Sequence, residues 1–147
     1  MINLIELTSD DLKYFSIFEK VTHTMPVDFL SASNTLIFLV EPNNLGKSIG
    51  KKGSNIKRLF ELFGKRVIIV GNSSDPEIFI RSYFSNIAIH SIEIRDVMGE
   101  KAIIVTIGEK DRGIMIGKNG ERIKAAKELL KRKFNATLHM KTRRTLV

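Results

Sequence analysis

The 147-residue sequence contains no cysteine and no tryptophan. The lack of cysteine excludes disulfides, zinc sites built from thiolates and a cysteine nucleophile. No apolar run approaches the roughly 18 residues that a membrane span requires. The N-terminus also lacks the basic start and long apolar core of a signal peptide. We therefore expect a cytoplasmic protein that does not enter a membrane.

The sequence also lacks the complete patterns of common nucleotide-dependent enzymes. Gly46, Lys47 and Ser48 match the end of a phosphate-binding P-loop, but Glu41 stands where its first glycine is needed. A second Gly-Lys pair, at 117–118, is followed by an asparagine, which lacks the magnesium-binding hydroxyl. The three histidines are scattered along the chain. We predict that the protein is not an enzyme and that it holds no metal and no cofactor.

Positive charge is what the sequence has in excess. Lysine and arginine number 24 against 16 aspartate and glutamate, a formal net charge of +8. Such an excess favours a polyanionic partner, most often nucleic acid and less often a membrane surface, although a soluble protein can be basic without one. The charges cluster at loops rather than along one amphipathic helix, which disfavours the membrane surface. A hydrophobic share of 43% is enough for one ordinary domain or two small ones.

The chain contains an internal repeat, seen when the sequence is shifted so that Gly46 falls on Gly113. Under this shift the apolar segment 36–40 also falls on 103–107. Identical residues coincide around two Gly-x-x-Gly segments: Ile49, Gly50, Lys51, Gly53, Ile56 and Lys57 fall on Ile116, Gly117, Lys118, Gly120, Ile123 and Lys124. We infer two copies of one supersecondary unit, each with its own core.

The boundary between the copies is predicted at the turn-forming segment 71–76. We divide the chain there into residues 1–71 and 72–147. Because this linker is short, we expect the copies to sit in a fixed relation and to form one continuous binding surface.

Hydrophobic periodicity predicts the same order of elements in each copy: helix, two strands, two helices and a strand. In the first copy, Ser9 or Asp10 caps a helix whose buried face includes Leu12, Phe15 and Phe18, and Pro26 marks its end. The remaining elements of the first copy are expected as strands at 27–32 and 35–40, a short helix at 45–49, a helix from 54 to 63 that buries Ile56, Leu59, Phe60 and Phe63, and a strand at 65–70.

In the second copy, Asp75 and Pro76 begin a helix that places Ile80, Phe84 and Ile87 on one face. The elements that follow are expected as strands at 90–97 and 102–107, a short helix capped by Asp111 and ending at 116, a helix from 121 to 133 and a strand at 136–141. Three strands backed by three helices make each copy a two-layer α+β module.

The chemistry of each Gly-x-x-Gly segment suits a phosphate. Glycines permit positive φ and close backbone approach, and the helix that follows directs free N–H groups at whatever lies over the loop. The central residues, Lys51-Lys52 and Lys118-Asn119, add charge or hydrogen-bond donors. A purely structural turn needs none of them, and two such loops in register are a stronger signal than one.

These loops resemble the signature of KH domains. The residues that bear the likeness are the segments 49–56, Ile-Gly-Lys-Lys-Gly-Ser-Asn-Ile, and 116–123, Ile-Gly-Lys-Asn-Gly-Glu-Arg-Ile. The element order is similar to the type II variant, and the likeness covers nearly the whole chain. Two such modules on a short Asp-Pro linker resemble the archaeal NusA-like transcription termination and antitermination factors. The opening segment 7–14 and the start of the second copy, 75–77, are also similar to that family.

The resemblance implies a single-stranded RNA-binding protein that modulates transcription termination or antitermination. A KH module clamps about four nucleotides, with the loop on the sugar-phosphate backbone. The implied groove floor is aliphatic and includes strand residues around Phe38 and Val105. The implied RNA-binding residues are Ile49, Gly50, Lys51, Lys52, Gly53, Ile56, Lys57, Ile116, Gly117, Lys118, Asn119, Gly120, Ile123 and Lys124.

RNA polymerase is the implied protein partner, and a monomer is expected. Unlike its bacterial relatives, the chain has no room for a polymerase-contacting N-terminal domain or an S1 domain. A role in ribosome assembly or RNA decay stays open as the alternative, because the fold and site would be the same. An RRM is disfavoured because no basic-aromatic strand is present. The basic segment 141–144 is expected as a tail that either adds non-specific, salt-dependent affinity or is simply a disordered end.

Overall fold

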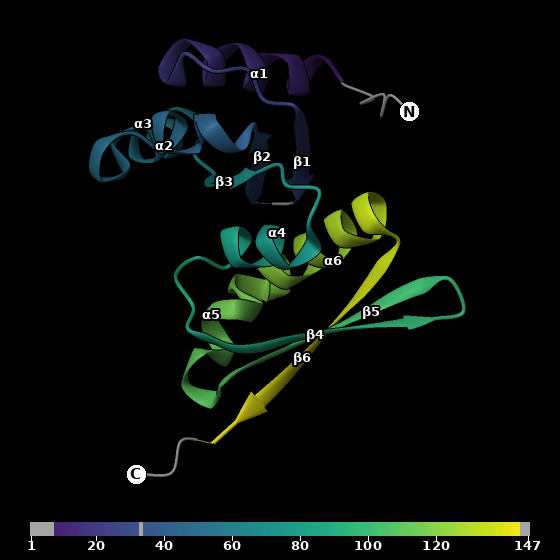
Figure 1. Ribbon diagram of the computed structural model, residues 1–147. Coiled ribbons are helices and arrows are strands. Elements are labelled where there is room, and N and C mark those ends of the chain that lie inside the picture. Colours follow the sequence, from purple (N-terminus) through teal and green to yellow (C-terminus); the bar gives the residue numbers. More distant parts are fainter. Residues whose placement is uncertain (1–7, 33, 145–147) are drawn as a thin grey trace. The chain divides into compact units, whose positions relative to one another are not determined.

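The computed structural model describes residues 8–32 and 34–144 of the chain. The chain divides into two compact units, residues 1–74 and 75–147. The sequence-based boundary at 71/72 falls in the same turn-rich segment and stays a prediction. Each unit has one three-stranded sheet with its helices on one face (Figure 1).

The first unit follows the predicted order of elements. They are α1 (Ser9–Thr22), β1 (Asp28–Ala32), β2 (Thr35–Val40), α2 (Leu45–Ile49), α3 (Ser54–Phe63) and β3 (Arg66–Gly71), with single 3-10 turns at Pro42–Asn44 and Lys51–Gly53. In the sheet, β2 lies in the middle, antiparallel to β1 and parallel to β3. Parallel neighbours need a crossover connection, which here contains α2, the glycine loop and α3.

The second unit repeats this topology. Its elements are α4 (Pro76–Tyr83), β4 (Ile89–Val97), β5 (Glu100–Gly108), α5 (Arg112–Ile116), α6 (Glu121–Phe134) and β6 (Ala136–Arg143), with single 3-10 turns at Glu109–Asp111 and Lys118–Gly120. Here β5 is central, antiparallel to β4 and parallel to β6. The predicted α+β class, with three strands backed by three helices in each copy, is confirmed.

The core of the first unit is aromatic and holds the loop helices in place. Phe18 of α1 stacks on Phe38 of β2 with ring centroids 4.3 Å apart, and Phe29 lies 5.0 Å from the Phe38 ring. Ile49 and Ile56, on either side of the glycine loop, pack against this core. The loop is therefore anchored at both ends by buried apolar contacts.

The start and end of α1 differ from the prediction. The N-cap is Thr8, not Ser9 or Asp10. The Thr8 hydroxyl accepts from the Asp11 N–H at 3.2 Å, and the Asp11 carboxylate accepts from the Thr8 N–H at 3.0 Å. This reciprocal capping box satisfies two N–H groups at once, so it defines the start of the helix. The helix also ends about one turn before Pro26.

Two apolar side chains predicted to be buried are exposed. Leu12 is 56% exposed, because residues spaced by threes drift around a helix of 3.6 residues per turn. Phe60 is 54% exposed. The short α3 meets the sheet with Ile56, Leu59 and Phe63, and Phe60 lies at the edge of that face.

In the second unit, α4 is shorter than predicted. It ends at Tyr83, so Phe84 and Ile87 lie beyond the helix, although both are buried together with Ile80. Asp111 occupies the N-cap position of α5, but its side chain makes no capping hydrogen bond there.

The hairpin between β4 and β5 is longer and tighter than predicted. Met98 and Gly99 both have positive φ, 52° and 85°, as a two-residue primed turn requires. The basic segment expected as a tail lies mostly in β6, which runs to Arg143. Ser33, in the gap between the strands predicted at 27–32 and 35–40, lies outside the described residues.

Candidate nucleic-acid interface

The two glycine loops have nearly the same backbone. The first glycines, Gly50 and Gly117, have φ of 80° and 78° and ψ of 166° and 173°. The second glycines, Gly53 and Gly120, both have φ of 72°. In each unit the short helix ends at the first glycine and the long helix begins directly after the second. Two different sequences thus fold into one loop geometry.

The first glycine of each loop is required by close approach as well as by φ. A Cβ on Gly50 would lie 2.7 Å from the Ser54 Oγ and 2.9 Å from the Asn55 backbone nitrogen. A Cβ on Gly117 would lie 2.5 Å from the Cβ of Arg122. Any side chain at these positions would therefore push the start of the long helix away from the loop.

The loop leaves backbone donors available. The Gly50 N–H donates to the Gly46 carbonyl at 3.0 Å, and the Gly53 N–H donates to the Gly50 carbonyl at 3.1 Å. The second loop makes the same two bonds at the same distances. Among the residues that the structure describes, the N–H groups of Lys51 and Lys52 have no hydrogen-bond partner. They can donate to an oxygen bound over the loop.

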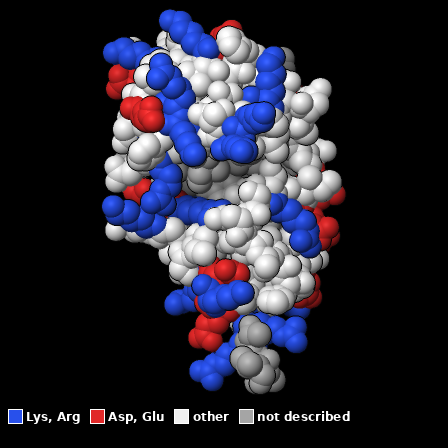
Figure 2. All heavy atoms as spheres, turned by 90° about the vertical axis from the view of Figure 1, so that its left-hand side faces the viewer, with Lys and Arg blue, Asp and Glu red and all other residues white. Residues whose placement is uncertain are grey.

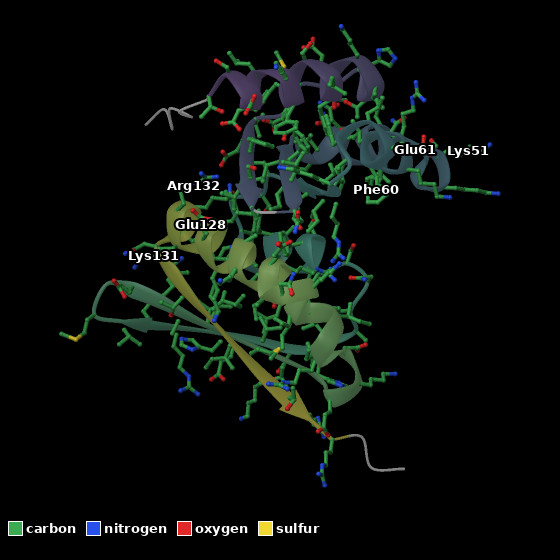
Figure 3. The ribbon with its side chains drawn as sticks, turned by 180° about the vertical axis from the view of Figure 1, so that it is seen from behind. Lys51, Phe60, Glu61, Glu128, Lys131 and Arg132 are labelled. Atoms are coloured by element: carbon green, nitrogen blue, oxygen red, sulfur yellow. The ribbon has the colours of Figure 1, made fainter. Side chains whose placement is uncertain are left out.

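The central side chains of both loops are exposed. They are Lys51 and Lys52 in the first and Lys118 and Asn119 in the second. Lys51 projects outward from the loop in Figure 3. Basic side chains gather on the loop-bearing side of the first unit (upper part of Figure 2). Lys52 and Asn119 both adopt the left-handed conformation, with φ of 55° and 57°. Asparagine tolerates this conformation better than lysine does.

A side chain at the second position of each long helix reaches back across the loop. The Asn55 amide donates to the Lys47 carbonyl at 3.1 Å, and the Arg122 guanidinium donates to the Ile114 carbonyl at 3.1 Å. The shift that aligns the two copies also aligns both donors and both acceptors. These bonds join the helices on either side of the loop, and they are not among the contacts predicted from the sequence. The available signal was a side chain with N–H donors at this position in both copies.

In the second unit, Arg122 also binds the end of α4. It donates to the Tyr83 carbonyl at 3.3 Å and to the Asn86 side chain at 2.6 Å, and it lies 5.2 Å from the centre of the Phe84 ring. The Tyr83 hydroxyl in turn donates to the Arg122 carbonyl at 2.7 Å. Burial raises the pKa of Tyr83 well above its usual range, while the Arg122 charge acts in the opposite direction. The hydroxyl therefore stays protonated and keeps donating.

In the first unit, a chain of buried hydroxyls supports the short helix instead. The Ser48 hydroxyl of α2 lies 2.8 Å from the Thr24 hydroxyl, which lies 2.9 Å from that of Thr22 at the end of α1. The Thr22 and Ser48 hydroxyls donate to the carbonyls of Phe18 and Asn44. Hydrogen bonding allows these hydroxyls to be buried without a large desolvation cost.

Comparisons with known proteins identify the modules and the family. One KH domain family model matches residues 76–143, and a second matches residues 35–96. The chain is similar to proteins called "Probable transcription termination protein NusA". It is 31% identical to that of Halococcus morrhuae, over 89% of this chain and 94% of the relative. It is 30% identical to that of Methanocaldococcus jannaschii, over 87% of this chain and 70% of the relative. The chain belongs to the archaeal NusA-like family.

A solved structure agrees with this assignment. The crystal structure of APE1850 is 33% identical in sequence and superimposes with a TM-score of 0.70. The match covers 93% of this NusA-like chain and 100% of that one. The predicted resemblance to NusA-like factors with tandem KH domains is thereby confirmed.

The residues predicted to form the aliphatic groove floor differ in their exposure to solvent. In this NusA-like chain, Ile49, Ile56 and their counterparts at 116 and 123 are half-buried, with part of each side chain accessible. Phe38 and Val105 are completely buried in the cores. The prediction that they line a groove floor is wrong, because their side chains point to the helical layer and leave no surface for a ligand.

The lysines on the long helices are exposed. Lys57 and Lys124 lie one turn beyond the loops, and Lys127 is accessible on α6. Lys131, two turns beyond Lys124 on α6, forms an ion pair with Glu100 at 3.2 Å. Its charge is therefore partly neutralised within the second unit.

The described residues contain no group of three or more histidine, aspartate or glutamate side chains that could hold a metal ion. No helix within residues 8–32 and 34–144 is long and apolar enough to cross a membrane.

Proposed function

We propose that the protein binds single-stranded RNA, with each glycine loop clamping the sugar-phosphate backbone. The observation that supports this most directly is the loop geometry itself, formed twice, with unused backbone donors under exposed basic or amide side chains. A phosphate over such a loop would meet N–H groups, lysine charge and the positive end of the following helix. A turn that served only to connect two helices would need none of these.

The proposed contacts extend from the loop onto the first turn of the long helix. Half-buried isoleucines beside the loop offer apolar surface to the bases, and the lysine one turn further on can reach a neighbouring phosphate. The proposed RNA-binding residues are Ile49, Gly50, Lys51, Lys52, Gly53, Ile56 and Lys57, and Ile116, Gly117, Lys118, Asn119, Gly120, Ile123 and Lys124. Each module would clamp about four nucleotides.

We place this binding in transcription termination or antitermination, with RNA polymerase as the protein partner. The names of the relatives support this role over ribosome assembly or RNA decay. Co-purification of the tagged protein with RNA polymerase from a cell extract treated with nuclease is the expected result. Recovery of ribosomal subunits without polymerase would favour the alternative.

The binding proposal is tested by reversing charge at the loops. Replacing Lys51 and Lys52 with aspartate, and Lys118 and Asn119 likewise, should reduce affinity for a single-stranded RNA by orders of magnitude. The fold should be unchanged, because all of these side chains are exposed. Fluorescence anisotropy measures the affinity, and circular dichroism checks the fold.

A charge-matched control separates the loop from net charge. Lys13→Asp combined with Lys127→Asp changes the charge as much as reversal of the first loop does, at exposed positions that belong to neither loop. This control should lose far less affinity than the first-loop variant. Undiminished RNA binding by the variant with both loops reversed would refute the proposed function.

A further inference from the structure

A cleft of about 600 Å³ opens in the first unit beside the glycine loop. It lies between α1 and α3 and is lined by Ile17, Lys20, Val21, Ser54, Asn55, Arg58 and Leu62. Ser54 and Asn55 directly follow the second glycine of the loop. The cleft therefore adjoins the loop. Clefts of this size are typical of sites for small ligands.

The lining combines apolar surface with free positive charge. Ile17, Val21 and Leu62 form the apolar part, and Leu62 is 48% exposed. Lys20 and Arg58 are both exposed, and neither forms an ion pair with any residue that the structure describes. The apolar part of this lining suits a nucleotide base, and the two cations suit a phosphate.

The cleft lies on the opposite side of α3 from the proposed loop-side contacts. At 100° per residue, Asn55, Arg58 and Leu62 fall on one flank of the buried face of the helix, and Lys57 and Phe60 fall on the other. A nucleotide in the cleft would thus lie outside the contacts assigned above. It would extend the bound strand around the N-terminal end of α3.

The second unit has filled the matching surface. Under the shift that aligns the loops, Arg58 corresponds to Ala125, which is 2% exposed, and Leu62 corresponds to Leu129, which is completely buried. Asn55 corresponds to Arg122, whose guanidinium is hydrogen-bonded to the end of α4. Ser54 corresponds to a glutamate, at position 121. At the positions of Arg58 and Leu62 the second unit therefore has buried apolar side chains and no cation.

We propose that the cleft between α1 and α3 binds one further nucleotide of the RNA strand clamped by the first loop. Lys20 and Arg58 contact its phosphate, and its base lies against Ile17 and Val21. This inference rests on the proposed RNA binding by the loops. With this cleft, the first module would bind one more nucleotide of the RNA than the second module does.

The test compares strands of different length on the full chain. The second loop is first disabled by Lys118→Asp and Asn119→Asp, so that binding reports the first module. Three labelled RNAs are used. The shortest has about four nucleotides, the span of a KH module. The other two each carry one added nucleotide, at the 5′ end in one and at the 3′ end in the other. One of the longer strands should bind more tightly, with a salt slope steeper by about 0.7 for the added phosphate.

Lys20→Ala combined with Arg58→Ala should abolish this gain and leave the affinity for the shortest strand unchanged. Lys13→Ala combined with Lys127→Ala removes the same charge at residues that do not line the cleft and should leave the gain intact. As an independent measurement, the methyl NMR signals of Ile17 should shift when the tighter-binding longer strand is added but not when the shortest strand is added.

The outcomes distinguish this inference from the proposed function. If reversal of the first loop, Lys51→Asp with Lys52→Asp, abolishes all binding but both longer strands behave like the shortest, only the cleft proposal fails. If the cleft variant and its control lose equal affinity on every strand, the cleft proposal also fails. If binding survives loop reversal, the proposed function fails, and the cleft proposal fails with it.

Discussion

The difference between the two loops predicts an exchange of salt dependence. Lys52 and Asn119 occupy the same place in two backbones that agree closely, with φ of 55° and 57° and ψ of 31° and 21°. Substituting one residue type for the other therefore changes a side chain with little change in geometry. Lys52→Asn removes one charge from the first loop, and Asn119→Lys adds one to the second.

The expected magnitude follows from counterion release. Each phosphate contact made by a lysine contributes about 0.7 to the slope of log affinity against log salt on a single strand. With the other loop reversed to aspartate, the native first loop should therefore show a slope steeper by about 0.7 than the native second loop. Over a fourfold change in salt, this slope difference corresponds to about 2.6-fold in affinity.

The assay is fluorescence anisotropy of a labelled single-stranded RNA of about four nucleotides, the span of one module, titrated at several salt concentrations. This length leaves out the further nucleotide proposed for the cleft beside the first loop. Lys52→Asn should bring the slope of the first loop to that of the second, and Asn119→Lys should do the reverse. Equal slopes for the two native loops would refute the reasoning. The reasoning would also be refuted if Lys52→Asn and Asn119→Lys left the salt slope of each loop unchanged.

Three further predictions concern how the loops are held. Gly50→Ala should cost about 1–3 kcal/mol of unfolding free energy, more than Gly53→Ala, because a Cβ at Gly53 meets open space. Arg122→Ala should destabilise its unit more than Asn55→Ala destabilises the other, because the Arg122 side chain bonds to Ile114, Tyr83 and Asn86, whereas that of Asn55 bonds to Lys47. Amide hydrogen exchange measures the stability of each unit separately. Tyr83→Phe should cost about 1 kcal/mol at neutral pH. It should also flatten the alkaline fall in stability, since the unfolded chain loses the tyrosine proton above about pH 10 and the folded unit retains it; denaturant unfolding on both sides of that pH measures this.

Local signals were enough to predict the elements around the loop. β2, α2 and the extent of α3 fall at the predicted residues, Thr35–Val40, Leu45–Ile49 and Ser54–Phe63. Each has a strong local determinant. A continuous β-branched and apolar run forms β2, and a turn that contains Pro42 precedes the short α2. Gly64, in the left-handed conformation, ends α3. The internal repeat added a second, independent reading of the same pattern.

The errors arose where tertiary contacts decide the outcome. Whether Phe60 is buried depends on how far α3 extends over the sheet, and periodicity alone does not contain that information. Phe38 was expected to be accessible, yet it lies among the rings of Phe18 and Phe29. The bonds of Arg122 to Tyr83 and Asn86 join residues far apart in sequence, so no local pattern predicts them.

The two units show which features of the loop are constrained. The short helix rests on a buried serine hydroxyl in the first unit, at Ser48, and on a buried methionine in the second, at Met115. The residue that reaches back across the loop is Asn55 in one and Arg122 in the other. The supports differ, but both glycine positions and the resulting φ angles are the same. Of the two central side chains, Lys51 and Lys118 match, whereas Lys52 is replaced by Asn119. The common features are therefore the placement of backbone donors and one lysine, which suit a ligand group present in every nucleotide. If the protein binds RNA as proposed, discrimination between RNA sequences is expected from residues outside the loops, and the cleft between α1 and α3 is one place where the two units differ.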